Sequence, residues 1–178
     1  IDLTNRLGTG YVFSSSHSTE EHALEDFKRY TKGMRPFEGK EPRLLKWRPS
    51  VLQNPWSGNV VAIGLSSGFL DPLEANALYM NLFSVQTLAR CLEKGYSAMT
   101  YNRLVNRIWR QVSDYIITHY SLSQRDDTEF WKYYKDLDAS KKIWDLYKKN
   151  QDELHVLFGS SLYATLALYY DEFSKYEN

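Results

Sequence analysis

Two carboxylates and two glycines lie close together in one short stretch of the chain. Asp71 stands before Pro72, and Glu74 follows two positions later. Asp before a helix, Pro at its first position and Glu at its third form the arrangement that caps a helix N-terminus. Gly64 and Gly68 come just before and let the backbone approach a ligand closely. Free N–H groups and the positive end of the helix dipole meet at such a start, so the stretch predicts a site that favours anions.

An apolar run precedes this stretch, and a long helix is expected to follow it. Residues 60–63 are Val-Val-Ala-Ile, a run typical of a strand that is covered on both faces. The helix is predicted to begin at Pro72 and to end at Lys94, because Gly95 suits a left-handed cap. Its apolar residues recur along one face, as on an amphipathic helix: Leu78, Leu82, Val85, Leu88, Ala89 and Leu92.

Glu74 is the residue in this stretch that is best suited to chemistry. A carboxylate near a helix start in a pocket can orient a ring N–H. It can also stabilise the cationic intermediate of an electrophilic aromatic substitution. Helix capping accounts for Glu74 without any chemistry, and the residues alone favour that explanation. A combination of the two roles stays open.

A second kind of chemistry is suggested by residues 64–68, Gly-Leu-Ser-Ser-Gly, which fit the Gly-x-Ser-x-Gly pattern of a serine nucleophile after a strand. Asp126, Asp127 and His155 could complete a triad by residue type. Such an elbow runs directly into a helix, whereas the start signals here come about five residues later. A serine hydrolase with Ser66 as nucleophile is therefore the alternative from another class.

Three stretches together resemble one known family. Residues 64–77 align without a gap with Gly-Leu-Ser-Ser-x-Phe-x-Glu-Pro-Leu-Glu-Ser-Thr-Gly of the flavin-dependent tryptophan halogenases. Residues 8–15 are similar to the family's Gly-Ser-Gly-Tyr-Val-Phe-Ser-Ser strand. Residues 119–120 and 125–131 are similar to its His-Tyr and Arg-Asp-Asp-Thr-x-Phe-Trp segment. Three blocks in the family's order are much more specific than any one of them.

The resemblance implies roles for six residues. Glu74 falls on the family's active-site Glu, which contacts the substrate beside the reacting carbon. Asn76 and Ala77 fall on the Thr-Gly pair whose backbone amides hold the halide. Leu65, Leu78 and Ala75 fall on positions at the flavin, although core packing also explains the two leucines. The replacements of Ser, Thr and Gly by Ala75, Asn76 and Ala77 put the halide preference and flavin coupling in question more than the fold.

The resemblance also implies a reaction and its reactants. The family uses FADH2 from a separate flavin reductase, together with O2 and a halide such as chloride or bromide, to halogenate an electron-rich aromatic compound such as tryptophan or another indole. Two alternatives stay open, a flavin-dependent hydroxylase and a halogenase-like protein with a closed halide site. Hydroxylases of related architecture usually carry Gly-Asp where residues 64–65 are Gly-Leu.

The implied fold is α+β and dominated by helices, with a few strands and a helical layer, as the distal part of a flavin-monooxygenase-like halogenase. We expect residues 1–178 to form one piece, rich in strands and loops up to residue 70 and helical from residue 71. The family's flavin fingerprint, Trp-x-Trp-x-Ile-Pro segment and catalytic Lys are not found in this sequence. The expected partners are therefore the N-terminal flavin-binding half, the reductase and the aromatic substrate, with room for a homodimer. The piece alone is expected to be inactive.

Composition narrows the remaining classes. The 22 basic and 22 acidic residues cancel, so no overall field favours nucleic acid or an anionic membrane as partner. No apolar run approaches the roughly 20 residues of a membrane-spanning helix. A single cysteine, Cys91, excludes an internal disulfide and a cysteine metal site, and the four histidines lack metal-ligand spacing. A cytoplasmic protein is the simplest expectation.

The other expected elements follow from local signals. Strands are predicted at 11–13 and 43–48, with a turn at 55–58. Helices are predicted at 19–32 with Ser18 as cap, from Thr100 with an apolar stripe to Ile116, and at 128–136, 140–150 and 160–174. Residues 125–128 are explained by capping and by a nearby ion pair of Arg125. Four aromatic residues are weaker candidates for a substrate wall: Trp131, Phe158, Tyr163 and Tyr169.

Overall fold

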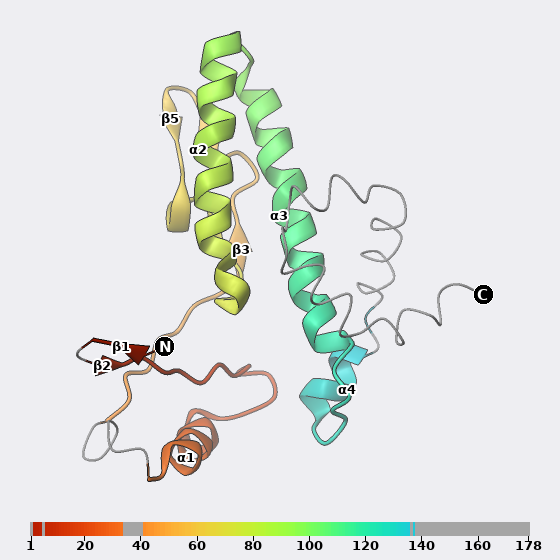
Figure 1. Ribbon diagram of the computed structural model, residues 1–178. Helices are drawn as coiled ribbons and strands as arrows, with labels where there is room; N and C mark the ends of the chain where they lie inside the picture. The colour runs from red at the N-terminus through yellow and green to blue at the C-terminus, as the bar shows by residue number, and fades with distance from the viewer. Residues whose placement is uncertain (1, 5, 34–40, 136, 138–178) are drawn as a thin grey trace. The chain divides into compact units, whose positions relative to one another are not determined.

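The computed structural model describes residues 2–4, 6–33, 41–135 and 137 (Figure 1). The chain divides into two compact units, Ile1–Trp47 and Arg48–Asn178, so the expected change of element type at residue 70 falls inside the second unit. The expected helices at 140–150 and 160–174 lie outside the described residues. The same holds for His155, Phe158, Tyr163 and Tyr169. The described residues are rich in helix and hold a few short strands, in agreement with an α+β piece.

The first unit contains a short hairpin and one helix. Strands β1 (Asp2–Leu3) and β2 (Arg6–Leu7) pair antiparallel, and helix α1 spans Glu20–Thr31. The helix was predicted within one residue at each end, but its cap is Thr19 and not Ser18. The Thr19 hydroxyl accepts the His22 N–H at 3.2 Å, because the helix begins one residue later than the capping signal suggested.

The two strands predicted in this unit are wrong. Residues 11–13 and 43–48 form no regular structure, although both are rich in strand formers. An extended segment becomes a strand only when its backbone groups pair with a neighbour. Each segment is instead attached to α1 by side chains. Tyr11 donates its hydroxyl to Asp26 at 3.3 Å, and Lys46 forms an ion pair with Glu20.

The second unit is built on a hairpin of two long helices. Helix α2 spans Asn76–Lys94 and helix α3 spans Ala98–Ser121 (Figure 1). The predicted left-handed cap of α2 is confirmed, since Gly95 has φ +65°. The predicted cap of α3 is wrong by three residues. Ser97 is the cap and accepts the N–H of Thr100 at 3.3 Å.

The core lies between these helices, and α3 supplies most of it. The predicted stripe of α3 is confirmed at seven of its eight residues, which are buried: Tyr101, Val105, Ile108, Trp109, Val112, Tyr115 and Ile116. The eighth, Leu104, is half-buried. From α2, Met80 and Cys91 join the core, and Ser84 is buried as well. Residues two positions apart on a helix lie on nearly opposite sides, so most of the predicted apolar stripe of α2 points away from this core. Leu88 is the exception, because it packs against the core.

Two short ribbons pack against the hairpin. Strand β3 (Ser50–Val51) pairs with β6 (Gly68–Phe69), and β4 (Trp56–Ser57) pairs with β5 (Val60–Val61). A strand is thus found at the central apolar run, but its expected cover on both faces is wrong, since Val60 is 66% exposed. The predicted turn at 55–58 is partly wrong, because Trp56 and Ser57 form strand β4 and the turn lies at residues 58–59. It contains the predicted Gly58, which has φ +58°.

Two Asn side chains of α3 hold residues 53–56, in the segment that leads from β3 to β4, in place. The Asn102 side chain accepts the Trp56 N–H at 2.8 Å and donates to the Trp56 carbonyl at 2.9 Å. Asn106 donates to the Gln53 carbonyl at 2.6 Å. Gly68 brings the β3–β6 ribbon equally close, because a Cβ there would lie 3.0 Å from the Ser50 carbonyl oxygen and 3.2 Å from the Trp109 ring. The ribbons therefore have one defined position on α3.

A short helix, α4 (Glu129–Lys135), follows α3 and confirms the helix predicted at 128–136. Its aromatic residues form a cluster with Tyr120 near the end of α3. Ring centroids of Tyr120 lie 5.5 Å from Phe130, 6.0 Å from Trp131 and 5.1 Å from Tyr134. None of the described helices combines the length and the apolar character needed to cross a membrane.

Candidate functional site

The segment from Gly64 to the start of α2 forms two tight turns on either side of β6. The first, η2 (Gly64–Ser66), is a 3-10 turn, and the second, η3 (Leu73–Ala75), is another. Helix α2 begins only at Asn76, so the predicted start at Pro72 is wrong. The last residue of η3, Ala75, stands directly before α2, and its φ of +54° and ψ of +29° are left-handed. Glu74 consequently lies in η3 and not in the third position of a helix.

Asp71 is the anchor of the second turn. One carboxylate oxygen accepts the Leu73 N–H at 2.9 Å, which closes a local turn and does not cap a regular helix. The other oxygen accepts the Tyr120 hydroxyl at 3.1 Å. Burial raises the pKa of Tyr120 well above its ordinary value, and the negative charge of the nearby Asp71 carboxylate raises it further. The phenol therefore stays a donor, and it links the turn to the aromatic cluster of α3 and α4.

Tyr120 was not singled out as a site residue from the sequence. Its only signal there was its place in the His-Tyr pair of the family resemblance. Arg125 also contacts the aromatic cluster around Tyr120, because its guanidinium carbon lies 4.9 Å from the Trp131 ring centroid. Arg125 binds Asp127 through two nitrogen atoms at 3.0 and 2.8 Å, which confirms the predicted ion pair. The hydrogen bond from Arg125 also lowers the pKa of Asp127.

The predicted halide pair lies at the first turn of α2. Asn76 is buried, with 6% of its surface exposed, and Ala77 is half-buried. The Asn76 backbone N–H donates to the Leu73 carbonyl. Its side-chain amide donates to the same oxygen at 2.6 Å. The Asn76 side chain thus closes the η3 turn onto itself.

The predicted flavin-contacting residues lie on the surface of the unit. Leu65 is 77% exposed and Leu78 is 66% exposed, and Ala75 is exposed as well. The explanation of both leucines as core residues is therefore wrong for the described structure. In the sequence, these two exposed apolar residues lie before and after the turn that carries Glu74.

Gly64 keeps the first turn against α2. It has φ +73°, and a Cβ at this position would lie 2.9 Å from the Asn81 side-chain oxygen. That oxygen is buried and has no hydrogen-bond donor among the described residues. Any side chain at position 64 would displace either Asn81 or the turn. Asn81 was missed in the sequence, because a lone Asn on a helix carries no motif.

The geometry does not support a serine nucleophile. Ser66 lies in the η2 turn, which leads into strand β6 and not into a helix. Its hydroxyl donates to the Ile63 carbonyl at 2.8 Å. Of the proposed triad partners, Asp127 is bound to Arg125. In the part of the chain that the structure describes, no group of three His, Cys, Asp or Glu side chains could hold a metal ion.

One other hollow lies on the second unit, between the 53–58 loop and the start of α3. It has a volume of about 510 Å³ and is open to solvent. Its lining is mostly polar and includes Asn102 and Asn106, which already bond to the backbone of the loop. These amides are explained by holding the loop, so the hollow carries no separate chemistry.

Known proteins match the chain over nearly its whole length. The family model described as tryptophan halogenase matches residues 1–170. Tryptophan 7-halogenase KtzQ of Kutzneria sp. (strain 744) is 34% identical over 143 residues, which are 77% of this chain and 26% of that protein. Tryptophan 7-halogenase RebH of Lentzea aerocolonigenes is 30% identical over 155 residues, 83% of this chain and 29% of that protein.

Solved structures agree with these sequence matches. The tryptophan 6-halogenase SttH of Streptomyces toxytricini aligns with a TM-score of 0.66 and 26% identity, over 78% of this chain and 29% of that one. BrvH, a flavin-dependent halogenase from Brevundimonas sp. BAL3, aligns with a TM-score of 0.61 and 28% identity, over 76% and 28%. This chain therefore spans less than a third of the length of these relatives. With a family model matched from residue 1 to residue 170, the chain belongs to the tryptophan halogenase family.

Proposed function

We propose that this chain is the C-terminal part of a flavin-dependent halogenase, with the distal part of a flavin-monooxygenase-like fold, and that it carries the halide turn and part of the substrate wall. The observation that supports this most is the segment from Asp71 to Ala77. It aligns with the family's motif without a gap, and its left-handed residue, Ala75, stands directly before the first turn of the long helix α2. The positive end of a helix dipole favours a small anion there.

The proposed reaction is the halogenation of an electron-rich aromatic compound, with tryptophan or another indole as the first candidate. O2 would be the oxidant: it would take two electrons from FAD that a separate flavin reductase has reduced, and two from chloride or bromide, which would become an electrophilic halogen donor. The exposed apolar side chains of Leu65 and Leu78 fit the flat ring of a flavin, with the Ala75 backbone between them. Glu74 would face the aromatic substrate and stabilise the positive charge that develops on its ring.

The halide would bind at the backbone N–H groups of Asn76 and Ala77. One of these is already used, because the Asn76 N–H donates to the Leu73 carbonyl. The Asn76 side chain donates to the same oxygen. Halide binding at this pair would therefore require the two contacts at Leu73 to loosen. A second candidate follows from this observation: a halogenase-like protein, or a flavin hydroxylase, whose halide site is closed by Asn76.

Product analysis separates the candidates. The chain would be co-expressed with the portion of KtzQ that lies outside the segment matched here, and supplied with a flavin reductase, FAD, tryptophan and either chloride or bromide. A halogenated product supports the first proposal, and a hydroxylated product supports the hydroxylase. A closed halide site predicts no halogenation by the unchanged chain and a gain of product in the double variant Asn76→Thr, Ala77→Gly. We expect the 178-residue chain alone to give no product.

Two further expectations belong to the same proposal. The protein would act in the cytoplasm, where reduced flavin is available from the reductase, and the assembled enzyme leaves room for a homodimer. A serine hydrolase would instead be labelled at Ser66 by a fluorophosphonate probe. We expect no labelling there, because the Ser66 hydroxyl is held by a backbone carbonyl.

A further inference from the structure

Helix α2 has an apolar side that nothing in the described structure covers. We call it the leucine face, and it consists of Leu78, Leu82, Val85, Ala89 and Leu92. Leu78, Leu82 and Leu92 are each at least 63% exposed, and Val85 is 52% exposed. The spacing alternates between four and three residues, which aligns all five on one side of the helix. The opposite side of α2 is already packed on α3.

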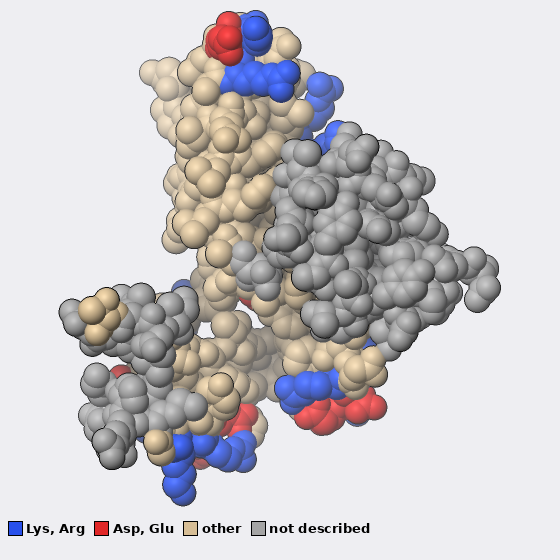
Figure 2. Space-filling view, in the orientation of Figure 1, with Lys and Arg blue, Asp and Glu red and all other residues tan. Residues whose placement is uncertain are grey.

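The surroundings of this face carry almost no charge. Between Arg48 and Arg90 the only Asp, Glu, Lys or Arg residues are Asp71 and Glu74. Figure 2 shows the side that α2 presents to the viewer without charged residues, except near its end beside the α2–α3 connection. Val60 and Leu65, 66% and 77% exposed, extend the exposed apolar surface of the same unit. A surface of this kind marks an interface, because isolated domains rarely leave large contiguous apolar patches in water.

We propose that the leucine face docks against the portion of the halogenase that this chain does not contain. The curated relatives are about three times as long as this chain, since the matched segment covers only 26% to 29% of the relatives and of the solved neighbour SttH. That remaining length must pack on some surface of the matched piece. The face also includes Leu78 and lies in the same unit as Leu65, the two positions that would contact flavin. A flavin-binding partner would cover both these exposed positions and the uncovered face of the helix.

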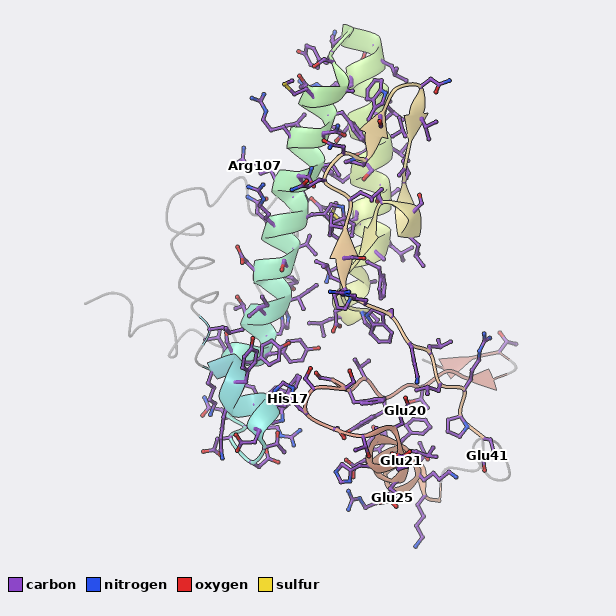
Figure 3. All side chains as sticks on the ribbon, turned by 180° about the vertical axis from the view of Figure 1, so that it is seen from behind. His17, Glu20, Glu21, Glu25, Glu41 and Arg107 are labelled. Carbon is purple, nitrogen blue, oxygen red and sulfur yellow. The ribbon has the colours of Figure 1, made fainter. Side chains whose placement is uncertain are left out.

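The opposite side of the hairpin offers a matched control. Helix α3 presents Arg103, Arg107 and Arg110 outward, and Figure 3 shows Arg107 directed away from α2. These arginines repeat at the same spacing of four and three residues as the leucines. A pair of substitutions on each helix therefore tests the two faces.

The first measurement is retention by a tagged partner. The portion of KtzQ outside the matched segment would carry a tag and be co-expressed with one of three chains. These are the unchanged chain, the double variant Leu82→Glu/Val85→Glu and the double variant Arg103→Glu/Arg107→Glu. We expect the leucine-face variant to be retained at least about tenfold less than the unchanged chain, as for central residues of an interface. The arginine variant should be retained like the unchanged chain. Equal retention of both variants, or no retention of the unchanged chain, would overturn the proposal.

The second measurement identifies the occupant directly. A photo-crosslinking amino acid is placed at position 82 and, as control, at position 103, and crosslinked peptides are identified by mass spectrometry. The proposal predicts crosslinks from position 82 into the KtzQ portion and none from position 103. Crosslinks from position 82 into residues 138–178 of the same chain, or into a second copy, would contradict it. The result does not depend on catalysis, so a failure of the proposed reaction remains distinguishable from a failure of this interface.

Discussion

Helices α2 and α3 pack on each other and have similar lengths, yet their outward faces are opposites. The outward face of α3 carries arginines, while that of α2 carries leucines and valine that are more than half exposed. An exposed arginine face is compatible with water, because charged side chains are readily hydrated. A leucine face is not, because its apolar area stays in contact with water until a partner covers it. The comparison therefore identifies the outward face of α2 as the side of the hairpin that needs a partner.

The largest expected effect tests the inner side of the hairpin. Trp109→Ala should lower the free energy of unfolding of the second unit by about 3–5 kcal/mol, because a large buried ring is lost and Trp109 is only 5% exposed. The matched variant Leu82→Ala on the outward face of α2 should change it by less than about 0.5 kcal/mol. Urea unfolding followed by circular dichroism measures both. Equal losses in the two variants would show that the leucine face is covered within this chain.

A smaller effect is expected at the link between α3 and the turn. Tyr120→Phe removes the hydrogen bond to the Asp71 carboxylate and should cost about 1.5–3 kcal/mol, as for bonds to charged groups. The neighbouring Tyr133→Phe serves as control, because Tyr133 is 53% exposed. Hydrogen exchange at the Leu73 amide should rise in the Tyr120 variant alone. Unchanged exchange there would mean that Asp71 holds the turn without Tyr120.

Alkaline pH should weaken the inner side of α2. Burial raises the pKa of Tyr79 to about 12, whereas a tyrosine in the unfolded chain ionises near pH 10. The folded state therefore keeps the neutral phenol, and its contribution is complete below about pH 10 and is lost as pH rises towards about 12. Urea midpoints measured across this range should fall. They should fall less in Tyr79→Phe.

The smallest effect is expected on the arginine face. Arg103→Gln and Arg110→Gln should each change the free energy of unfolding by less than about 0.5 kcal/mol, because both side chains are exposed and solvated. Thermal unfolding of the two variants checks this. A clear loss in either one would mean that the outer side of α3 is also an interface, and the contrast with α2 would disappear.

The positions of the helices were largely predictable from the sequence. The stripe of α3 from Tyr101 to Ile116 is continuous over about four turns, and Gly95 has the residue type that its left-handed conformation requires. The start of α2 was not predictable, because the capping signals at Asp71 and Pro72 are used by a 3-10 turn that ends at a left-handed Ala75. A left-handed alanine has no sequence signature.

The predictions of two strands and of the buried side of α2 failed for a different reason. Strand formers at 11–13 and 43–48 had no neighbouring strand to pair with, and pairing partners far apart in sequence leave no local trace. The periodicity of α2 correctly found an apolar face, but periodicity cannot say what covers it. The face that packs on α3 includes Asn76, Met80, Ser84 and Cys91, and its polar members concealed it.

The central claim is that the turn at residues 71–77 is the halide turn of a halogenase, with Glu74 at the substrate. Mass spectrometry of the product from tryptophan and chloride tests it most directly, in the chain assembled with the KtzQ portion and in the same assembly with Glu74→Gln. The account predicts chlorinated product from the unchanged chain and a loss of about 100-fold or more in the variant, as for the removal of a transition-state charge. Equal amounts of chlorinated product from both assemblies would contradict it.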